Sequence, residues 1–486
     1  MAALALLQHY LDYLTSPAVI ISFLIVIVPI IYTVAQERLL IAGSLTKQKL
    51  TGLRRLGLSG RSHLDGQHDL SVSEGDNQPY IKALFTYPIK SCRGIELAAS
   101  EVGTTGLKYD RMFAFAQLVP SKSASEGSSD ELAEQDVPQK QQWRFVTQRD
   151  FPRLASVQTE LWVTGSARKN TSSPVNRSTE RGPSHGQART RSRARGETLK
   201  GQLEQGANKQ KGATPTHNEV VRNGCLVLRF HVSRLYGMWN QQLSVVVPIS
   251  PSVDYAKAKG YKSEKLSIWK DCPLATNVTP EFEPAALTAL RMFLGATKPL
   301  ALFRIDASTR RPVTRSLPTN QPEAKYHIGF ADAFPVNILS LASVKAIDKQ
   351  LPSEAATKHH LDARRFRANI YLTGTSAFAE DKWKLLSLGR RIGRDKKGLF
   401  ECEADYHVAC RTARCTMPNV DPETGIKDTN EPYSTLAKTR KVDRGADPFP
   451  CLGMQMIPLF ERGFLRVGDE VVVRETGEHV YEKMFA

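Results

Sequence analysis

The sequence of 486 residues contains no GxGxxG, no Walker P-loop and no GxSxG motif. Nucleotide binding on a Rossmann or P-loop fold and α/β-hydrolase chemistry therefore have no support. Cysteine is scarce, with seven residues that form no CxxC pair and no repeated spacing. This odd, scattered set argues against a disulfide framework and is typical of a protein in a reducing compartment.

Aromatic residues are absent from the most basic part of the chain. Residues 166–218 contain eleven Lys or Arg against three Glu, and no Phe, Trp or Tyr, within a chain of net charge +17. Such a segment cannot bury enough apolar surface to offset the entropy of ordering it, so we predict a disordered basic insertion. Contact with nucleic acid or a membrane surface is the alternative. Because side chains for base stacking are missing, we expect a solvated loop and no nucleic-acid partner.

The longest apolar run covers residues 18–35 and carries no charge. As a helix it would be about 27 Å long, close to the hydrocarbon thickness of a bilayer. A cleaved signal peptide is the alternative, but no Lys or Arg precedes the run and the run is long for such a peptide. We predict a retained transmembrane helix over residues 18–36, behind an N-terminal segment 1–17. Basic residues that follow it place the body of the chain in the cytosol.

The remainder of the chain divides into a tether and a strand-rich body. Residues 37–79 are predicted to form a polar tether. From Tyr80 onward, short runs rich in β-branched and aromatic residues are broken by Gly and Pro, and helical patterns occur only near residues 287–295, 339–351 and 433–439. We predict an α+β fold dominated by strands, with one or two β-barrels and peripheral helices.

One stretch near the C-terminus, VACRTARCTMPNVDPETG (residues 408–425), places Cys410 and Cys415 among arginines ahead of a turn-rich acidic run. A metal site, a disulfide, a nucleophile and a buried apolar pair are all possible there. Zinc bound with the help of His407 is disfavoured because no second cluster supplies the other ligands. The stretch alone leaves the other interpretations open.

Several stretches of the body resemble, in the right order, the domains of the MOSC family. LFTYPIKSCRGIELAASEVGTTGLKYDRMF and RFVTQRDFPRLASVQTEL resemble the N-terminal β-barrel domain that accompanies MOSC domains. IGFADAFPVNILSLASVKAIDKQL, RRFRANIYLTG, CRTARCTMPNVDPETG and LRVGDEVVV resemble the MOSC domain itself. The resemblance implies an N-terminal barrel domain over residues 80–270, interrupted by the insertion 166–218, and a MOSC domain over residues 271–486.

The resemblance also implies a molybdenum–molybdopterin cofactor. Cys415 then corresponds to the catalytic thiolate that ligates the metal, a role that suits a soft, electron-rich sulfur; Cys410 corresponds to a cysteine that is not the ligand. The implied cofactor-binding residues are Lys90, Ser91, Arg111, Arg367 and Asn369. Taken singly, each of these could be a surface or structural residue, and Cys415 could be a buried apolar one. Pyridoxal phosphate binding is a further property that the family allows.

The sequence departs from the family at residues 332–335, which read Asp-Ala-Phe-Pro. Relatives carry Thr and Ser after the Asp, so two hydroxyl donors are lost and the ring of Phe334 enters. Two extra residues also separate Cys410 from Cys415. The change at residues 332–335 bears on the substrate range more than on cofactor binding, whereas the two extra residues bear on the geometry of the loop that carries Cys415.

The group of the family that this chain resembles most reduces N-hydroxylated compounds at the outer mitochondrial membrane. The resemblance therefore implies a membrane-anchored molybdenum oxidoreductase, in the outer mitochondrial membrane or the endoplasmic reticulum, acting on a small N-hydroxylated substrate. No flavin motif or ferredoxin-like cysteine cluster is present, so electrons would come from cytochrome b5 and NADH-cytochrome b5 reductase. The alternatives are a sulfur-transfer or carrier protein for the cofactor, and an anchored interaction protein that has lost it.

Deleting residues 166–218 is expected to leave the thermal midpoint of the protein nearly unchanged, because a segment without core-forming residues contributes little to the folded state. Differential scanning calorimetry of the full-length and deleted chains measures the difference. A large drop in the midpoint would mean that the segment packs against the body.

Overall fold

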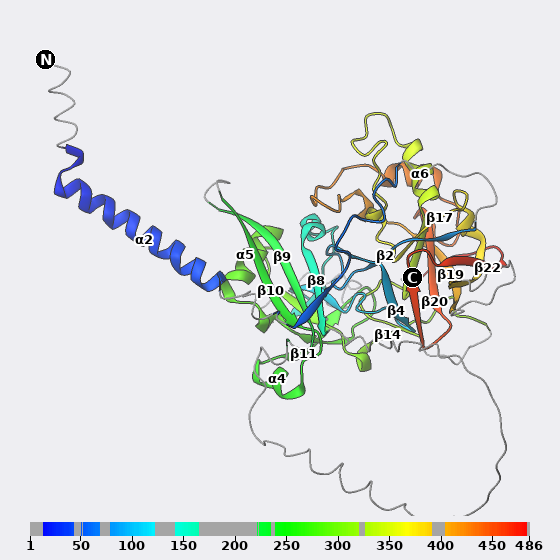
Figure 1. Ribbon diagram of the computed structural model, residues 1–486, viewed down its shortest axis with the longest axis horizontal. Coiled ribbons are helices and arrows are strands. Elements are labelled where there is room, and N and C mark those ends of the chain that lie inside the picture. The colour runs from blue at the N-terminus through cyan, green and yellow to red at the C-terminus, as the bar shows by residue number, and fades with distance from the viewer. Residues whose placement is uncertain are drawn as a thin grey trace, which may run out of the picture.

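Strands dominate the structure (Figure 1). The computed structural model describes residues 13–42, 50, 52–68, 78–121, 141–164, 221, 223–234, 239–319, 326–390 and 404–483. The predicted basic insertion over residues 166–218 lies outside these described ranges, as does Cys402. Two β-barrels are present, so the predicted strand-dominated fold with barrels is confirmed.

The first barrel is closed and has five strands, in the order β11-β12-β13-β6-β7. Their bounds are Phe113–Pro120 (β6), Gln141–Phe145 (β7), Lys262–Ser267 (β11), Leu274–Asn277 (β12) and Leu300–Arg304 (β13). All pairs are antiparallel except β11 with β7. The first barrel therefore extends beyond residue 270, the predicted end of the N-terminal domain, because β12 and β13 belong to it.

The second barrel is built on an eight-stranded sheet in the order β17-β16-β20-β19-β18-β22-β2-β3, closed by an additional pairing of β17 with β2. The strands are Tyr80–Thr86 (β2), Ile95–Leu97 (β3), Val336–Ser340 (β16), Ile370–Thr373 (β17), Trp383–Gly389 (β18), Ala404–Ala413 (β19), Cys451–Pro458 (β20) and Glu470–Thr476 (β22). The chain thus contributes β2 to this barrel, leaves it to build the first barrel, and then returns.

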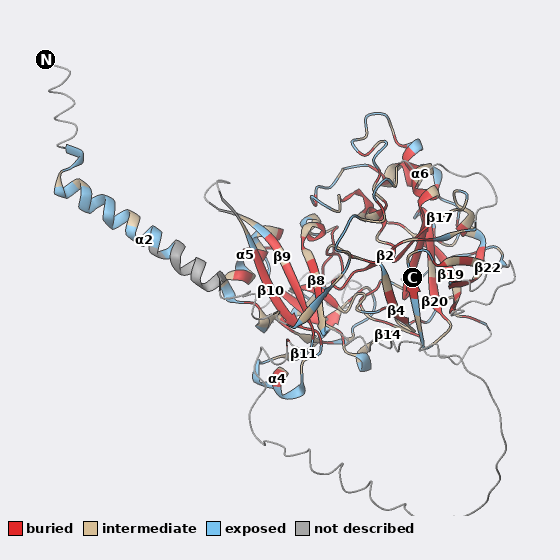
Figure 2. Ribbon diagram, in the orientation of Figure 1, coloured by how far each residue is buried: buried red, intermediate tan, exposed pale blue. Residues whose placement is uncertain are grey.

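The central strands of the second barrel are buried on both faces, as Figure 2 shows. All five residues of β16 are buried, and so are most residues of β19 and β20. The burial includes polar side chains such as Asn337, Ser340 and Arg411, because both faces of these strands are covered.

Three smaller sheets surround the barrels. A four-stranded sheet has the order β1-β8-β9-β10, a three-stranded sheet the order β21-β4-β5, and β14 pairs with β15. Their bounds are Leu53–Leu56 (β1), Ala99–Gly103 (β4), Gly106–Leu107 (β5), Gln158–Thr164 (β8), Cys225–Arg234 (β9), Trp239–Pro248 (β10), Arg311–Pro312 (β14), His327–Ile328 (β15) and Arg462–Arg466 (β21).

The predicted tether over residues 37–79 needs correction where the structure describes it. Strand β1 pairs antiparallel with β8, with Leu56 opposite Leu161, and the side chain of Leu64 is buried in a core cluster. Residues 52–68 are therefore part of the folded body. The physical reason is that the few leucines of this polar segment find apolar partners that lie far away in the sequence.

Apart from the long helix α2 (Pro17–Ala42), the helices are short and lie at the periphery of the barrels. They are Val253–Ala258 (α4), Pro284–Leu294 (α5), Leu341–Gln350 (α6) and Tyr433–Thr439 (α7), with 3-10 turns at Pro152–Ser156 (η2), Thr279–Glu281 (η3), Ala307–Thr309 (η4), Ala363–Phe366 (η5), Ala379–Lys382 (η6) and Met417–Asn419 (η7). Helix α6 begins where the hydroxyl of Ser340 accepts from the backbone N–H of Ala342. Helices α5, α6 and α7 match the three predicted helical stretches.

Helix α2 extends away from the body, and many of its apolar side chains are exposed (Figures 1 and 2). The predicted helix over residues 18–36 is therefore present. Among the residues that the structure describes, however, no helix combines the length and the apolar character needed to cross a bilayer. The prediction that this segment is a transmembrane anchor is thus not supported.

Gly106, at the β4–β5 turn, lies against the backbone just before β16. Its φ is +94°, and a Cβ at this position would lie 3.0 Å from the carbonyl carbon of Pro335 and closer still to its oxygen. Gly468 has a similar φ of +91° but has no atom within 4 Å of the same position. Comparing alanine substitutions at these two glycines therefore separates the cost of the backbone conformation from the cost of a steric clash.

Gly106→Ala is expected to lower the free energy of unfolding by about 2–4 kcal/mol, because strain at positive φ adds to overpacking. Gly468→Ala, the matched control, should lose only about 1–2 kcal/mol through its φ. Urea denaturation of the two variants checks this. Equal losses would show that the contact with Pro335 is relaxed without cost.

Candidate functional site

A cavity of about 380 Å³ lies where loops of the two barrels meet. It is lined by all six residues that the sequence predicts for the site: Lys90, Ser91, Arg111, Arg367, Asn369 and Cys415. They come from the loop after β2, the turn before β6, the segment between η5 and β17, and the loop after β19. The fold therefore brings together four stretches that are far apart in the sequence.

Three of these residues adopt a left-handed backbone conformation. The φ angles are 67° at Ser91, 46° at Arg111 and 53° at Arg367, values that are uncommon for residues other than glycine. Hydrogen bonds hold this geometry; the N–H of Arg111, for example, donates to the carbonyl of Tyr87 at 2.8 Å. Backbone strain of this kind concentrates at functional sites. Its occurrence at three lining residues indicates that the cavity wall is held in a defined shape.

Asn369 acts inside the wall of the cavity. Its amide nitrogen donates to the carbonyl of Phe85 and to Asp110, and its amide oxygen accepts from Asn337 N–H and from Arg111. These four contacts use the full hydrogen-bonding capacity of the amide. Asn369 therefore orients its neighbours, above all Arg111, and has no side-chain donor left for a ligand.

Arg111 and Arg367 lie against the ring of Tyr87. Their guanidinium carbons are 4.7 Å and 4.4 Å from the ring centroid. Arg111 forms an ion pair with Asp110 at 2.5 Å. Arg367 has no carboxylate partner among the described residues, and its buried Nη2 has no hydrogen-bond partner there. Burial lowers the pKa of Arg367, but an arginine keeps its charge, so an uncompensated cation faces the cavity.

Arg414, immediately before Cys415, was not predicted as a site residue. It is buried; its Nε donates to the carbonyl of Leu452 at 2.8 Å and its Nη1 to that of Phe366 at 2.7 Å. Its Nη2 has no partner among the described residues. Burial lowers its pKa to about 10, so the group is protonated at neutral pH. Its position next to the cysteine was the only signal in the sequence.

The two cysteines of the C-terminal stretch occupy different environments. Cys410 is fully buried in β19 within an apolar cluster that includes Phe334, and burial raises its pKa well above the ordinary value. Cys415 is half-buried and lines the cavity, just before the short helix η7. Of the two thiols, only that of Cys415 can meet a ligand in the cavity.

Lys90 pairs with Asp332 at the edge of the cavity. Its ammonium lies 2.5 Å from the carboxylate and also donates to the carbonyl of Phe330 at 2.9 Å. Burial lowers the pKa of Lys90 to about 8, although Asp332 opposes this shift. The Asp332 side chain is 52% exposed at the edge of the cavity. Partial desolvation there raises its pKa, but the ammonium of Lys90 outweighs this effect and holds the pKa below the usual value.

Phe334 packs into the apolar cluster that also contains Ile328 and Ile457, and it is 3% exposed. It contributes to the cavity wall. Phe334 therefore gives this part of the cavity wall an apolar surface, which Ala331 and Ala333 extend.

The cavity fits an anionic organic group. Eight Lys or Arg but only two Asp line it. Buried polar atoms without a partner among the described residues face the same region: Ser91 Oγ, Asn337 Oδ1, Arg367 Nη2, Thr412 Oγ1 and Arg414 Nη2. Unpaired buried polar atoms are costly, so they indicate a missing ligand or solvent.

A metal ion beside Cys415 would need ligands from such a group. Within the described ranges, no three His, Cys, Asp or Glu residues gather in a way that could hold a metal. The chain could thus supply the one thiolate, while an organic ligand held by the cationic wall supplies further donor atoms. A pterin with a phosphate and a dithiolene matches these requirements of charge and donor type.

Comparison with known proteins identifies the family of two parts of the chain. Residues 325–472 match the MOSC domain and residues 78–202 match the MOSC N-terminal beta barrel domain. The chain is 29% identical over 180 residues to the mitochondrial amidoxime reducing component 2 of Rattus norvegicus, covering 36% of this chain and 47% of that protein.

Two further relatives are the mitochondrial amidoxime-reducing component 1 of Mus musculus and the component 2 of Bos taurus. Identity is 32% over 151 residues for the first, covering 30% of this chain and 38% of the relative. For the second it is 33% over 156 residues, covering 31% and 40%. The chain therefore spans less than half the length of each of these relatives.

Lys90 is expected to make the free energy of unfolding rise between pH 8 and about 10. With a pKa of about 8 in the folded state and 10.5 as its ordinary value, the folded state binds fewer protons than the unfolded state in this window. Relative to Lys90→Met, the cofactor-free wild type should gain at most about 3 kcal/mol across the window. Below pH 8 both states are protonated, and the difference should be flat.

Urea denaturation of both proteins at several pH values measures this gain, and subtracting the variant removes the contributions of other groups. A difference that stays constant from pH 7.5 to 10 would mean that Lys90 keeps an ordinary pKa.

Proposed function

Since the chain carries a MOSC domain preceded by a MOSC N-terminal β-barrel domain, we propose that it is a molybdenum-cofactor-dependent reductase of N-hydroxylated compounds. The observation that carries this proposal is the convergence of Cys415 with unpaired cationic groups in one cavity. The names of its relatives, amidoxime-reducing components, supply the reaction class.

The cationic groups of the cavity would bind the phosphate and pterin of the cofactor. Arg367 and Arg414 each offer an unpaired N–H, and Ser91 offers an unpaired hydroxyl. Arginine suits this task because its planar guanidinium binds phosphate through two parallel hydrogen bonds and does not lose its proton. Lys90 adds a further charge, since two of its three ammonium hydrogens are used within the protein.

Cys415 would be the protein ligand of molybdenum and the catalytic thiolate. When bound, the cofactor supplies the two-electron exchange with the substrate. The chain keeps the thiol at the cavity surface, orients the cationic groups through Asn369 and Asp110, and presents an apolar wall at Ala333 and Phe334. We propose that this wall contacts the organic part of the substrate.

Electrons would come from separate proteins, because the sequence has no flavin motif and no ferredoxin-like cysteine cluster. We propose cytochrome b5 and NADH-cytochrome b5 reductase as donors. The relatives are mitochondrial components by name, and we propose the mitochondrion as the site of action.

Cys415→Ala is expected to abolish reduction of benzamidoxime by the full-length chain made in cells that synthesise the cofactor, because the metal loses its protein ligand. Cys410→Ala is the matched control: it removes a thiol of the same stretch that does not line the cavity, and it should retain molybdenum and activity. Elemental analysis measures bound molybdenum, pterin fluorescence measures the bound cofactor, and an assay with reduced cytochrome b5 measures activity.

Turnover that survives Cys415→Ala would exclude the ligand assignment. Well-folded wild-type protein without molybdenum would exclude the function. Bound molybdenum without reduction of the substrate would favour the carrier or sulfur-transfer function instead.

A further inference from the structure

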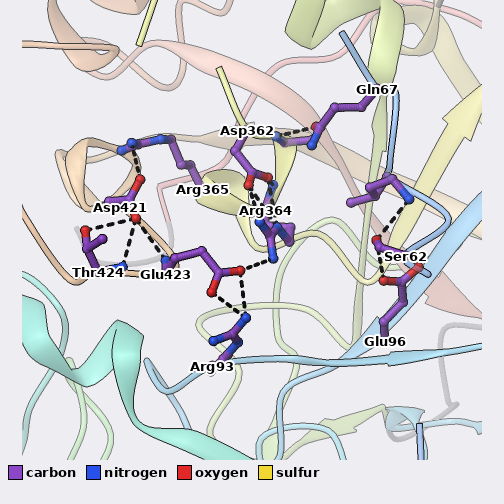
Figure 3. A network of polar contacts seen from close by, with 12 residues as sticks. Ser62, Gln67, Arg93, Glu96, Asp362, Arg364, Arg365, Asp421, Glu423 and Thr424 are labelled. Carbon is purple, nitrogen blue, oxygen red and sulfur yellow. Dashed lines mark hydrogen bonds and ion pairs between the residues drawn. The ribbon is translucent and has the colours of Figure 1, made fainter. Parts of the chain in front are cut away.

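The acidic run that follows Cys415 joins the segments that carry the site residues (Figure 3). After η7, the chain turns at Asp421, and Gly425 lies against the backbone of η2, the turn between β7 and β8: a Cβ on Gly425 would be 2.9 Å from Arg153 Cα. The loop from Thr416 to Gly425 is therefore in close contact with a segment that lies far from Cys415 in the sequence.

Asp421 fixes the shape of this loop. Its Oδ1 accepts from the N–H of Glu423 at 3.0 Å and from the N–H and hydroxyl of Thr424 at 2.9 Å and 3.0 Å. Its Oδ2 accepts from Arg365 at 2.8 Å. An Asp that bonds the backbone two and three residues ahead sets a local turn. This turn directs the side chain of Glu423 outward from the loop.

The carboxylate of Glu423 receives two guanidinium groups at once. Arg93 Nη2 lies 2.6 Å and 2.5 Å from its two oxygens, and Arg364 Nη1 lies 2.5 Å from Oε1. Arg364 is itself oriented by Asp362, which accepts from its Nε and Nη2. In Figure 3 the three side chains meet at one point, with Glu423 between the two arginines.

Each arginine belongs to a segment that carries cavity residues. Arg93 follows Lys90 and Ser91 in the loop after β2, and Arg364 lies in the turn η5, which ends just before Arg367. Glu423 follows Cys415 in the same loop. The carboxylate of Glu423 thus connects the three stretches that hold the cationic wall and the thiol, in addition to the contact of Asp421 with Arg365.

We propose that Glu423 is a positioning residue that clamps the Cys415 loop to the two anion-binding segments, Lys90–Ser91 and Arg364–Arg367. The inference rests on the proposed function for its role in cofactor binding, whereas the clamp itself concerns only this chain. Glu423 does not line the cavity and acts through the segments that it joins.

The clamp acts on site geometry more than on global stability. The side chains of Arg93, Glu423 and Arg364 are 32%, 43% and 29% exposed, and ion pairs of such exposure contribute little to stability and weaken in salt. The backbone of Arg93 is held independently of its side chain. Its N–H donates to the carbonyl of Val157, and its carbonyl accepts from the hydroxyl of Thr159. Removing the carboxylate should therefore loosen the loop without unfolding the barrel.

The test measures alkylation of Cys415 in the cofactor-free, full-length protein. Iodoacetamide labelling followed by peptide mass spectrometry gives the rate at Cys415, and exposed Cys272 in the same sample serves as the internal reference. Glu423→Gln keeps the size of the side chain and removes its charge. Glu354→Gln is the matched control, at an exposed glutamate that accepts a hydrogen bond from the adjacent Ser353 and lies outside the clamp.

At low salt, Glu423→Gln is expected to raise the labelling rate at Cys415 by about threefold to tenfold, while Glu354→Gln leaves it at the wild-type value. In 1 M salt the wild-type rate should rise towards that of the variant, which itself changes little, because salt screens the pair that the variant lacks. The thermal midpoint should change little in either variant. A general structural defect would not produce this dependence on salt.

A second measurement uses the double variant Arg93→Gln/Glu423→Gln, whose labelling rate should equal that of Glu423→Gln alone if the two groups act as one clamp. Equal rates in the wild type and Glu423→Gln, or additive effects in the double variant, would overturn the proposal. These readouts need no cofactor, so they are independent of whether molybdenum binds.

For protein made with the cofactor, Glu423→Gln should retain about tenfold less molybdenum after gel filtration than Glu354→Gln, the scale of loss typical for residues that orient metal ligands. Equal retention would overturn the role of the clamp in cofactor binding, whereas absence of molybdenum from the wild type would instead refute the proposed function.

Discussion

Strands β2 and β17, far apart in the sequence, pair antiparallel with Leu84 opposite Ile370, and their contact closes the second barrel. The N–H of Phe85 donates to the carbonyl of Asn369, and the Asn369 amide donates back to the carbonyl of Phe85. The loop that follows β2 is thereby placed beside the turn that precedes β17. Every cationic group that these two segments contribute to the cavity depends on this pairing.

Charge compensation explains why the cavity favours an anion. Four carboxylates each neutralise one cation that lines it: Asp110 pairs with Arg111, Asp332 with Lys90, Asp421 with Arg365 and Asp443 with Arg411. Arg367 and Arg414 have no such partner among the described residues, yet each is held in place by its surroundings. Burying a cation without a counter-charge is costly, and a bound phosphate would remove that cost. Binding of an anionic ligand would therefore also stabilise the folded protein.

Sequence reasoning located the strands, three helices and the six lining residues, because these depend on local periodicity and on motifs in a fixed order. It placed Asn369 in contact with the cofactor, whereas the amide is fully used within the wall. It did not identify Arg414, since one arginine in the run RTARC resembles a surface residue until its burial against the carbonyls of Leu452 and Phe366 is known. The acidic residues that follow Cys415, Asp421 and Glu423, gained a role only when their arginine partners were located.

By itself, the sequence determined which residue types are available: one thiol followed by a turn, arginines around it, and strands short enough to form barrels. These are local properties, set by composition and spacing. The tertiary structure alone decided which arginines lack a carboxylate and that part of the predicted tether is a strand. The physical reason is that burial and charge pairing arise between residues brought together from distant parts of the chain, so neither can be deduced from the neighbours of a residue in the sequence.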